Sequence, residues 1–296
     1  MRGGWICLDK PGGISSNKAM LKVRAILEEK KTGYLGTLDP FATGVLPVAV
    51  GEARKYIRFV DESQKCYVFT VVFGKTTDTL DETGKVTATV DFVPDAGAVS
   101  RVIPEFIGEI RQTPPQFSAV KIDGRRACDR VRRGEIVSPK PRSVRINDLR
   151  IIAENFEKNE MTMEVTCSGG TYVRSLARDL AEKLGSLACV KTLRRNKSGF
   201  FSVRDAISLE KLREMKDTGK LADALISVER PLDDIPALYL GGESVSGLRN
   251  GVAVPADRGV VVSSNVRIFD DDGIFRGIGF VSEDGLVKPV RMGAYD

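Results

Sequence analysis

The chain has 296 residues, with 45 lysines and arginines against 40 aspartates and glutamates, which gives a net charge of +5. Its apolar content of 42% is ordinary for a globular protein and excludes general disorder and a fibrous architecture. The length favours two domains. No apolar run approaches the ~18 residues that a membrane helix needs, and residues 1–13 hold no apolar stretch typical of a secretory signal. We therefore expect a cytoplasmic protein that does not act at a membrane.

The sequence contains no histidine, which removes the commonest general base and the commonest metal ligand. Ser-His-Asp, Cys-His and histidine-based zinc chemistry are therefore excluded within one chain. The five cysteines are far apart, and they fit neither a disulfide framework nor a CxxC metal site. Any catalysis must use carboxylates, Lys, Arg, Tyr, Ser or Thr, and no metal is expected.

The first quarter of the chain predicts a helix, a long loop and two strands. Ser15 or Ser16 can cap a helix whose apolar residues recur at helical spacing. That apolar face consists of Ala19, Val23, Ile26 and Leu27. Residues 30–44 form a loop rich in Gly, Thr and Pro that is long for a simple connection, which indicates a function. Buried strands are expected at 46–51 and at 66–74, the second covered on both faces.

Further along, the pattern predicts a helix at 95–103 that Pro104 ends. Strict alternation of apolar residues at 161–167 predicts a half-buried strand. A glycine turn then leads into a helix at about 171–184, with Gly185 where a C-terminal cap belongs. This strand, turn and helix unit exposes the first helical turn at the end of the strand, which is a natural place for a site.

The last part of the sequence changes to short apolar segments separated by Gly and by acidic turns. Asp-Gly turns between β-prone segments predict hairpins, and five or six such strands indicate a small β-barrel. The boundary lies between Arg230 and Ile235, so we predict one domain over residues 1–232 and a second over residues 233–296.

The positive charge is concentrated in residues 111–150, which hold 11 Lys or Arg and 4 Asp or Glu, a net of +7. A cluster of basic residues commonly forms a solvated helix face. The alternative is a surface that contacts phosphates, because clustered guanidinium groups release counterions from a nucleic acid backbone.

The stretch GTLDPFATGVLP at 36–47 is the most unusual of the chain. Pro40 restricts Asp39 to an extended conformation, and Gly36 lets another backbone or a ligand approach closely. Asp before Pro is also common turn chemistry. An aspartic protease is excluded because a second Asp triplet is missing.

Five stretches in the same order resemble the TruB family of pseudouridine synthases, which isomerise uridine 55 in the T loop of tRNA. They are LDKPGGISS, GTLDPFATGVLPVAVGEARK, KCYVFTVVFGKTTDTLDETG, QTPPQFSAVKIDG and CSGGTYVRSLARDLAEKLG. The C-terminal segments resemble the RNA-binding PUA domain. The resemblance implies an α+β fold, in which flanking helices cover a mixed, largely antiparallel central sheet and a small PUA-like β-barrel follows.

The resemblance also assigns roles to matching positions. Asp39 matches the family's nucleophile, Arg174 matches the arginine that pairs with it, and Tyr67 matches the tyrosine that contacts the target base and is a candidate for the later proton removal. Lys10 matches a lysine whose role is structural or near the site. The expected substrate-binding residues are Lys10, Tyr34, Gly36, Lys121, Arg125, Arg126 and Tyr172. The expected partner is the T-arm stem-loop of tRNA, with base flipping and with no cofactor, metal or obligatory protein partner.

Three positions depart from the family pattern. Tyr34 stands where the family usually has His, Phe117 stands where it usually has Tyr, and Cys128 stands where Tyr is common. Tyr34 can still stack on a displaced base, so we expect altered affinity and retained activity.

Two other functions compete with this interpretation. One is a pseudouridine synthase that acts on another RNA, and the other is a non-catalytic protein that binds or folds tRNA. The chemical path also stays open between attack at the ribose C1′, attack at the base and prior removal of a ribose proton.

Overall fold

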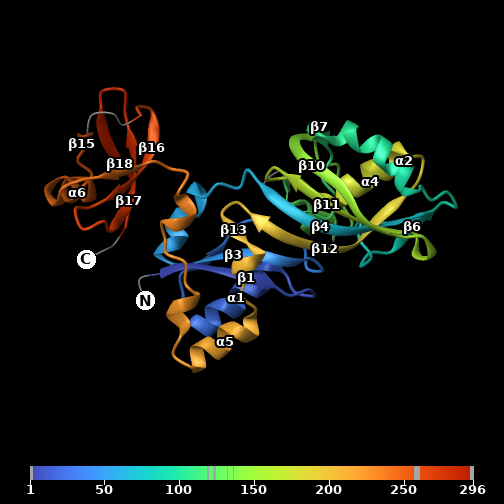
Figure 1. Ribbon diagram of the computed structural model, residues 1–296, viewed down its shortest axis with the longest axis horizontal. Coiled ribbons are helices and arrows are strands. Elements are labelled where there is room, and N and C mark those ends of the chain that lie inside the picture. Colours follow the sequence, from blue (N-terminus) through green and yellow to red (C-terminus); the bar gives the residue numbers. More distant parts are fainter. Residues whose placement is uncertain are drawn as a thin grey trace.

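The computed structural model describes residues 3–118, 120–122, 125–131, 133–135, 137–256 and 261–293, with the backbone alone at 121, 122, 125, 126 and 128. A nine-stranded sheet runs through most of the chain in the order β1-β3-β12-β4-β11-β10-β7, with β2 beside β3 and β13 beside β12 (Figure 1). The strands are β1 (Gly3–Lys10), β2 (Thr32–Tyr34), β3 (Thr43–Gly51), β4 (Lys65–Phe73), β7 (Gly108–Gln112), β10 (Arg142–Asn155), β11 (Glu160–Cys167), β12 (Ala188–Ser198) and β13 (Phe201–Ser202).

The described pairings in this sheet are antiparallel, except that β12 runs parallel to β3. β12 therefore joins the β1–β3 half to the β4–β11–β10 half, and the mixed, largely antiparallel sheet that we predicted is confirmed. Two short hairpins extend from it, β5 (Lys75–Thr77) with β6 (Val86–Thr89), and β8 (Lys121–Ile122) with β9 (Arg125–Arg126).

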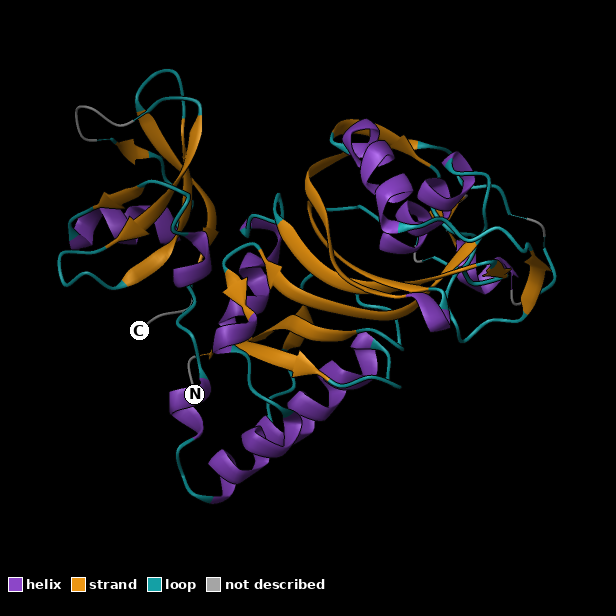
Figure 2. Cartoon of the chain, turned by 45° about the vertical axis from the view of Figure 1, so that its right-hand side comes forward, coloured by secondary structure: helices purple, strands orange, loops and turns teal. Residues whose placement is uncertain are grey.

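Helices cover both halves of the sheet, as Figures 1 and 2 show. α1 (Ser16–Leu27) and α5 (Leu209–Asp217) lie against the β1–β3 half, while α2 (Ala96–Val102) and α4 (Val173–Lys183) lie against the other half. A shorter helix, α3 (Ala127–Val131), follows β9. The 3₁₀ segments are Glu52–Phe59, Ile103–Phe106, Phe156–Lys158, Val203–Asp205, Leu221–Ala224 and Arg230–Leu232.

The structure confirms the helices and strands that we predicted from strong periodicity. Ser15 caps α1 by accepting a hydrogen bond from the Lys18 amide, and all four residues of its predicted apolar face are buried. α2 has Asp95 as its N-cap. The alternating side chains of β11 are buried as expected, and Gly185 follows α4 with φ +72°, the left-handed conformation that glycine adopts at a helix end.

One prediction about the sheet was wrong for part of a strand. We expected both faces of β4 to be covered, but its side chains alternate between buried and half-buried from Lys65 to Thr70, and only the last three are all buried. The half-buried face of the first part lies toward the open side of the sheet, so aromatic and β-branched composition did not by itself indicate two covered faces.

The C-terminal part forms a separate five-stranded sheet in the order β14-β16-β17-β18-β15, which confirms the predicted small β unit. Its strands are β14 (Ala237–Tyr239), β15 (Val254–Pro255), β16 (Ser264–Phe269), β17 (Phe275–Val281) and β18 (Leu286–Met292), with α6 (Gly242–Arg249) beside them. It contacts the larger part through one apolar cluster, in which the rings of Tyr56 and Phe275 lie 5.2 Å apart. Among the described residues, no helix combines the length and apolar character needed to cross a membrane.

Candidate active site

The loop between β2 and β3 carries Asp39, and several contacts hold it against α1. The Ser16 hydroxyl accepts a hydrogen bond from the Leu38 amide at 2.8 Å and lies at the same distance from the Leu38 carbonyl oxygen. The Gly13 amide donates to the Pro40 carbonyl, also at 2.8 Å, and the Ala42 amide donates to the Asp39 carbonyl at 3.1 Å. The backbone on both sides of Asp39 is therefore fixed.

Lys10 supports this loop from below. Its ammonium donates to the carbonyl oxygens of Pro11 and Ile14 at 2.8 Å and of Pro40 at 3.3 Å, and its side chain is 0% exposed. Burial lowers the pKa of Lys10 to about 8, while the charge of Asp39 opposes that shift. A direct contact between Lys10 and a substrate, which we expected, does not fit this position, because the ammonium is enclosed and already bonded. The geometry fits the structural role.

Arg174 begins α4 and pairs with Asp39. Its Nε lies 2.9 Å from Asp39 Oδ2, and its Nη2 donates to Asp39 Oδ1 at 3.0 Å. The same guanidinium donates to the carbonyl oxygens of Thr79 at 2.6 Å and of Phe117 at 3.0 Å. The Arg174 side chain is only 3% exposed, so four contacts from three segments fix its position. The pairing that the resemblance implied is present in the structure.

A second carboxylate, Asp81, lies on the other side of Arg174. Its Oδ2 is 3.6 Å from Nη1 of Arg174, and its Oδ1 accepts hydrogen bonds from the hydroxyls of Thr79 and Thr83. Asp81 belongs to the segment TTDTLDETG and was not among the site residues predicted from the sequence. Its local sequence is that of an ordinary polar turn, and only the long-range approach of α4 places a cation beside it.

The surroundings of Asp39 act on the pKa of its carboxyl group in opposite directions. Burial, supported by the nearby charge of Asp81, raises the pKa of Asp39, while the charge and hydrogen bond of Arg174 lower it. The side chain keeps 31% of its surface exposed, because one side of the carboxylate faces a cavity. The result is a carboxylate that is oriented by one hydrogen bond and one close ion-pair contact from Arg174, and that is open to a ligand.

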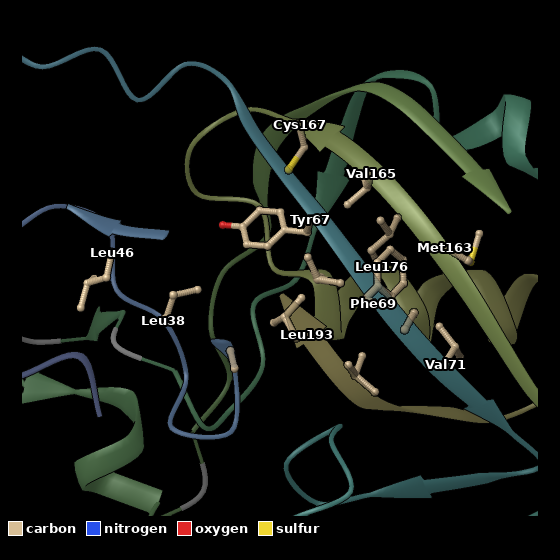
Figure 3. Packing of buried hydrophobic residues seen from close by; sticks show 14 of the residues in the cluster. Leu38, Leu46, Tyr67, Phe69, Val71, Met163, Val165, Cys167, Leu176 and Leu193 are labelled. Atoms are coloured by element: carbon tan, nitrogen blue, oxygen red, sulfur yellow. The ribbon is translucent and has the colours of Figure 1, made fainter. Parts of the chain in front are cut away.

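Tyr67 projects from β4 into the same cavity. Figure 3 shows its ring at the end of the apolar row of Phe69, Val71 and Leu193, with the hydroxyl pointing toward the segment of Leu38. Burial raises the pKa of Tyr67, and Arg195 opposes that shift. Tyr67 thus lines the cavity, with its oxygen on the side of the Asp39 loop (Figure 3).

Two adjoining cavities meet at Asp39. The first, of about 310 Å³, is lined by Asp39, Tyr67, Arg142, Tyr172 and Arg174 among others. The second, of about 910 Å³, shares Thr37, Leu38, Asp39 and Arg174 with the first and extends past Tyr34, Phe41 and Asp81. Cavities of this size accept small organic ligands, so a nucleoside can reach the carboxylate.

Comparisons with known proteins identify the family. Residues 24–173 match the model of the TruB family pseudouridylate synthase N-terminal domain, and residues 174–235 and 236–292 match two C-terminal models of the same family. The chain belongs to the TruB family. It is an isomerase of the pseudouridine synthase class, as the sequence resemblance implied.

Relatives of the TruB family cover nearly the whole chain. A protein named tRNA pseudouridine synthase B from Zymomonas mobilis is 45% identical over 90% of this chain and 89% of its own length. Another of the same name from Caulobacter vibrioides is 43% identical over 85% of this chain and 81% of its own. A chain in the crystal structure of a Cbf5-Nop10-Gar1 complex superposes with a TM-score of 0.74 at 25% identity, covering 98% of this chain and 84% of that one.

The other expected TruB site residues differ in whether the structure places them at the two cavities. Tyr172 lines the smaller cavity beneath Arg142, whose guanidinium lies 4.7 Å from the centre of its ring, and Tyr34 lines the larger one. Gly36 adopts φ +66°, and a Cβ there would lie 2.7 Å from Glu62 Oε1, so glycine is needed for the shape of the loop. The side chains of Lys121, Arg125 and Arg126, together with that of Cys128, lie outside the described part of the structure.

Two of these findings refine the expectations. Phe117 contacts Arg174 through its carbonyl oxygen, so the exchange of the family's usual tyrosine for phenylalanine leaves that contact intact. Arg142, which the sequence analysis did not select, lines the cavity and stacks on Tyr172. The sequence signal for Arg142 was weak, because it was one of eleven basic residues in segment 111–150.

Proposed function

We propose that this chain isomerises uridine 55 in the T loop of tRNA to pseudouridine, with Asp39 as the nucleophile. The observation that carries the proposal is the pairing between Arg174 and Asp39 at the junction of two cavities of nucleoside size. The shared name of the relatives, tRNA pseudouridine synthase B, supports tRNA as the substrate. Such a reaction takes place in the cytoplasm, where tRNA is used.

The chemistry fits the side chains in the cleft. The bond between N1 of the base and C1′ of the ribose breaks, the base turns, and C5 forms a new bond to C1′. An ionised carboxylate can hold the reaction together by a transient covalent bond, and Arg174 favours ionisation and sets the direction of its oxygens. Attack at C1′, attack at the base and initial removal of a ribose proton all require the ionised form of Asp39 that Arg174 supports.

The final step removes the hydrogen from C5. When that C–H bond breaks, its electron pair restores the double bond between C5 and C6, and N1 takes a proton from solvent. Tyr67 lies on the wall of the smaller cavity, opposite the loop of Asp39, so its ring can contact the turning base. We propose that the Tyr67 hydroxyl first gives its proton to solvent and that the phenolate then accepts the C5 proton and becomes phenol again, while the proton that N1 takes up from solvent balances the one released.

We propose that the target base is flipped out of its stack in the T loop. The position of Asp39 in the lining of a cavity, beside the buried Arg174, supports this. Extruding the nucleotide costs about a few kcal/mol. Stacking on Tyr34 and Tyr172 and phosphate contacts from segment 111–150 offset this cost. We propose that the domain at residues 233–296 binds RNA beyond the loop.

An unmodified tRNA transcript tests the proposal. Incubation with the purified chain should yield pseudouridine at position 55, and a matched transcript with cytidine at that position should yield none. Product at another position or in another RNA would support the competing synthase. Tight binding without any product would support a protein that only binds or folds tRNA, and either result would contradict the proposal.

A further inference from the structure

Arg195 is a buried cation to which the reaction above assigns no role. It lies on β12, where its register partners are Tyr67 on β4 and Gly44 on β3. Its side chain is 0% exposed, and no ion pair within the described residues includes it. A buried guanidinium without a carboxylate carries a large desolvation cost, so the acceptors around it should indicate what it holds.

Two of its nitrogens bind the segment that carries Asp39. Nε donates to the Val45 carbonyl at 2.8 Å, and Nη2 donates to the Gly36 carbonyl at 2.8 Å. Gly36 precedes Asp39 by three residues and Val45 follows it by six, so one guanidinium fixes both ends of the catalytic loop. The fit at Gly36 is close, since a Cβ there would lie 3.1 Å from Nη1 of Arg195.

The third nitrogen, Nη1, is buried and makes no hydrogen bond of good geometry within the described chain. Arg195 and Tyr67 are register partners on neighbouring antiparallel strands, so their buried side chains lie on the same face of the sheet. In keeping with this closeness, Arg195 opposes the rise that burial causes in the pKa of Tyr67. A guanidinium has donors and no acceptor, so toward Tyr67 it can only donate to the phenol oxygen. Tyr67 and the loop of Asp39 thus share one cation.

We propose that Arg195 is a positioning residue that holds the phenol oxygen of Tyr67 at a fixed place relative to the Asp39 loop. Arg195 touches no substrate, because the loop and β4 enclose it. Donation to the phenol oxygen stabilises negative charge there and directs the remaining lone pairs toward the cavity, as an acceptor of the C5 proton requires. The inference rests on the proposed function and assigns a purpose to a cation that the reaction leaves unused.

A double-mutant cycle tests whether Arg195 acts through Tyr67. The variants are Arg195→Lys, Tyr67→Phe and their combination, and the measurement is the single-turnover rate on saturating T-arm RNA. We expect Arg195→Lys to slow the reaction about 10- to 100-fold, because a lysine cannot donate in three directions from one plane. In the Tyr67→Phe background the same substitution should lose most of this effect and keep only the part that acts through the Asp39 loop. Effects that multiply across the cycle would overturn the proposal.

A second readout identifies the slow step. The target uridine carries deuterium at C5, and the rate of Arg195→Lys is compared on labelled and unlabelled RNA. If Arg195 positions the acceptor of the C5 proton, the labelled RNA reacts more slowly. A variant that loses rate with equal rates on both RNAs would have lost an earlier step through the Asp39 loop, and the proposal would fail.

Two further variants distinguish the loss of the positioning role from a folding defect. Arg195→Gln removes the charge and keeps donors, so it should be slower than Arg195→Lys while the affinity for RNA stays unchanged. Arg194→Lys is the matched control, because Arg194 is the adjacent residue and pairs with Asp9 near the surface. It should keep the wild-type rate. Rates within about twofold of wild type for both Arg195 variants would overturn the proposal.

The proposed function can fail separately from this inference. A Tyr67→Phe variant with the wild-type rate would remove the role of Tyr67 in proton transfer. A slow Tyr67→Phe variant whose defect multiplies with that of Arg195→Lys would leave the function in place and refute the positioning role alone.

Discussion

At the scale of single residues, Asp39 combines a partner that favours its charge with surroundings that disfavour it. Burial and Asp81 raise its pKa, and Arg174 lowers it. A partly buried carboxylate is less hydrated than a free one, so less water has to leave its oxygens before they bond to carbon. If Asp39 is the nucleophile, as we propose, the activity should fall on the acid side, because protonation removes the ionised carboxylate.

Replacing Asp81 with asparagine should change that pH dependence. Asp81 raises the pKa of Asp39, so its neutralisation lowers that pKa and moves the acid limb of the single-turnover rate to lower pH. The plateau should fall about tenfold, because Arg174 loses a charged neighbour 3.6 Å away.

The control for this measurement is Asp78→Asn in the same turn, where the carboxylate accepts a hydrogen bond from the Lys85 amide and is exposed. It should leave the acid limb in place. An acid limb that does not move in Asp81→Asn, or that moves to higher pH, would show that Asp81 does not act on Asp39.

At the scale of elements, the catalytic loop is held from beneath by side chains of β1 and α1. Lys10 and Ser16 reach the backbone of Leu38 and Pro40, and Arg195 reaches Gly36. The loop is therefore rigid, because side chains from three elements, β1, α1 and β12, hydrogen-bond to its backbone. Its precise form depends on groups that make no contact with a substrate.

Substituting Lys10 with methionine should destabilise the protein. The change keeps the apolar stem but removes the Lys10 donor from the carbonyl oxygens of Pro11 and Ile14, while Pro40 keeps only the Gly13 amide, so the free energy of unfolding should fall by about 2–4 kcal/mol. Urea denaturation measures the change. Lys18→Met, on the exposed face of α1, is the control and should unfold at the wild-type urea concentration. Equal stability of Lys10→Met and wild type would contradict the supporting role.

The sequence predicted what depends on neighbours along the chain. The periodicity of α1, α4 and β11 reflects which face of each element is buried, and the cap at Ser15 is a local hydrogen bond. The α6 helix was missed, because its two glycines weaken the helical pattern. Asp81 and Arg195 were missed for another reason. Their roles arise where α4 meets the hairpin of β5 and where β12 meets β3 and β4, far apart in sequence.

The site residues, too, were predicted only in part from the sequence. Asp39, Tyr67, Arg174, Tyr34 and Tyr172 were placed at the cleft by family resemblance, and the structure brings them to two adjoining cavities. Composition alone could not do this, because an Asp before Pro also suits a turn. Lys10 was assigned to the substrate and instead lies beneath the loop, since a sequence motif does not show which side of the backbone a lysine faces.

At the scale of the whole molecule, charge and domain arrangement suit a long RNA substrate. Segment 111–150 carries a net charge of +7, and among its described residues Phe117, Ser118, Val120, Asp129 and Arg142 line the cleft. The C-terminal sheet stands at the far end of the molecule (Figure 1).

Reversing the charge of Arg125 and Arg126 to glutamate should weaken tRNA binding. If both contact phosphates, the slope of log affinity against log salt should become shallower by about two. Arg213→Glu with Lys220→Glu makes the same charge change near α5 and should leave the slope unchanged. An unchanged slope in the Arg125 and Arg126 variant would assign them to a solvated surface.

The central claim is that Asp39 forms the transient bond in the isomerisation. The most direct measurement is single-turnover formation of pseudouridine in tRNA by Asp39→Asn, with Asp223→Asn, an exposed aspartate far along the chain, as the control. We predict no product from Asp39→Asn, nearly unchanged tRNA affinity, and the wild-type rate from the control. Product formation by Asp39→Asn at the wild-type rate would contradict the account.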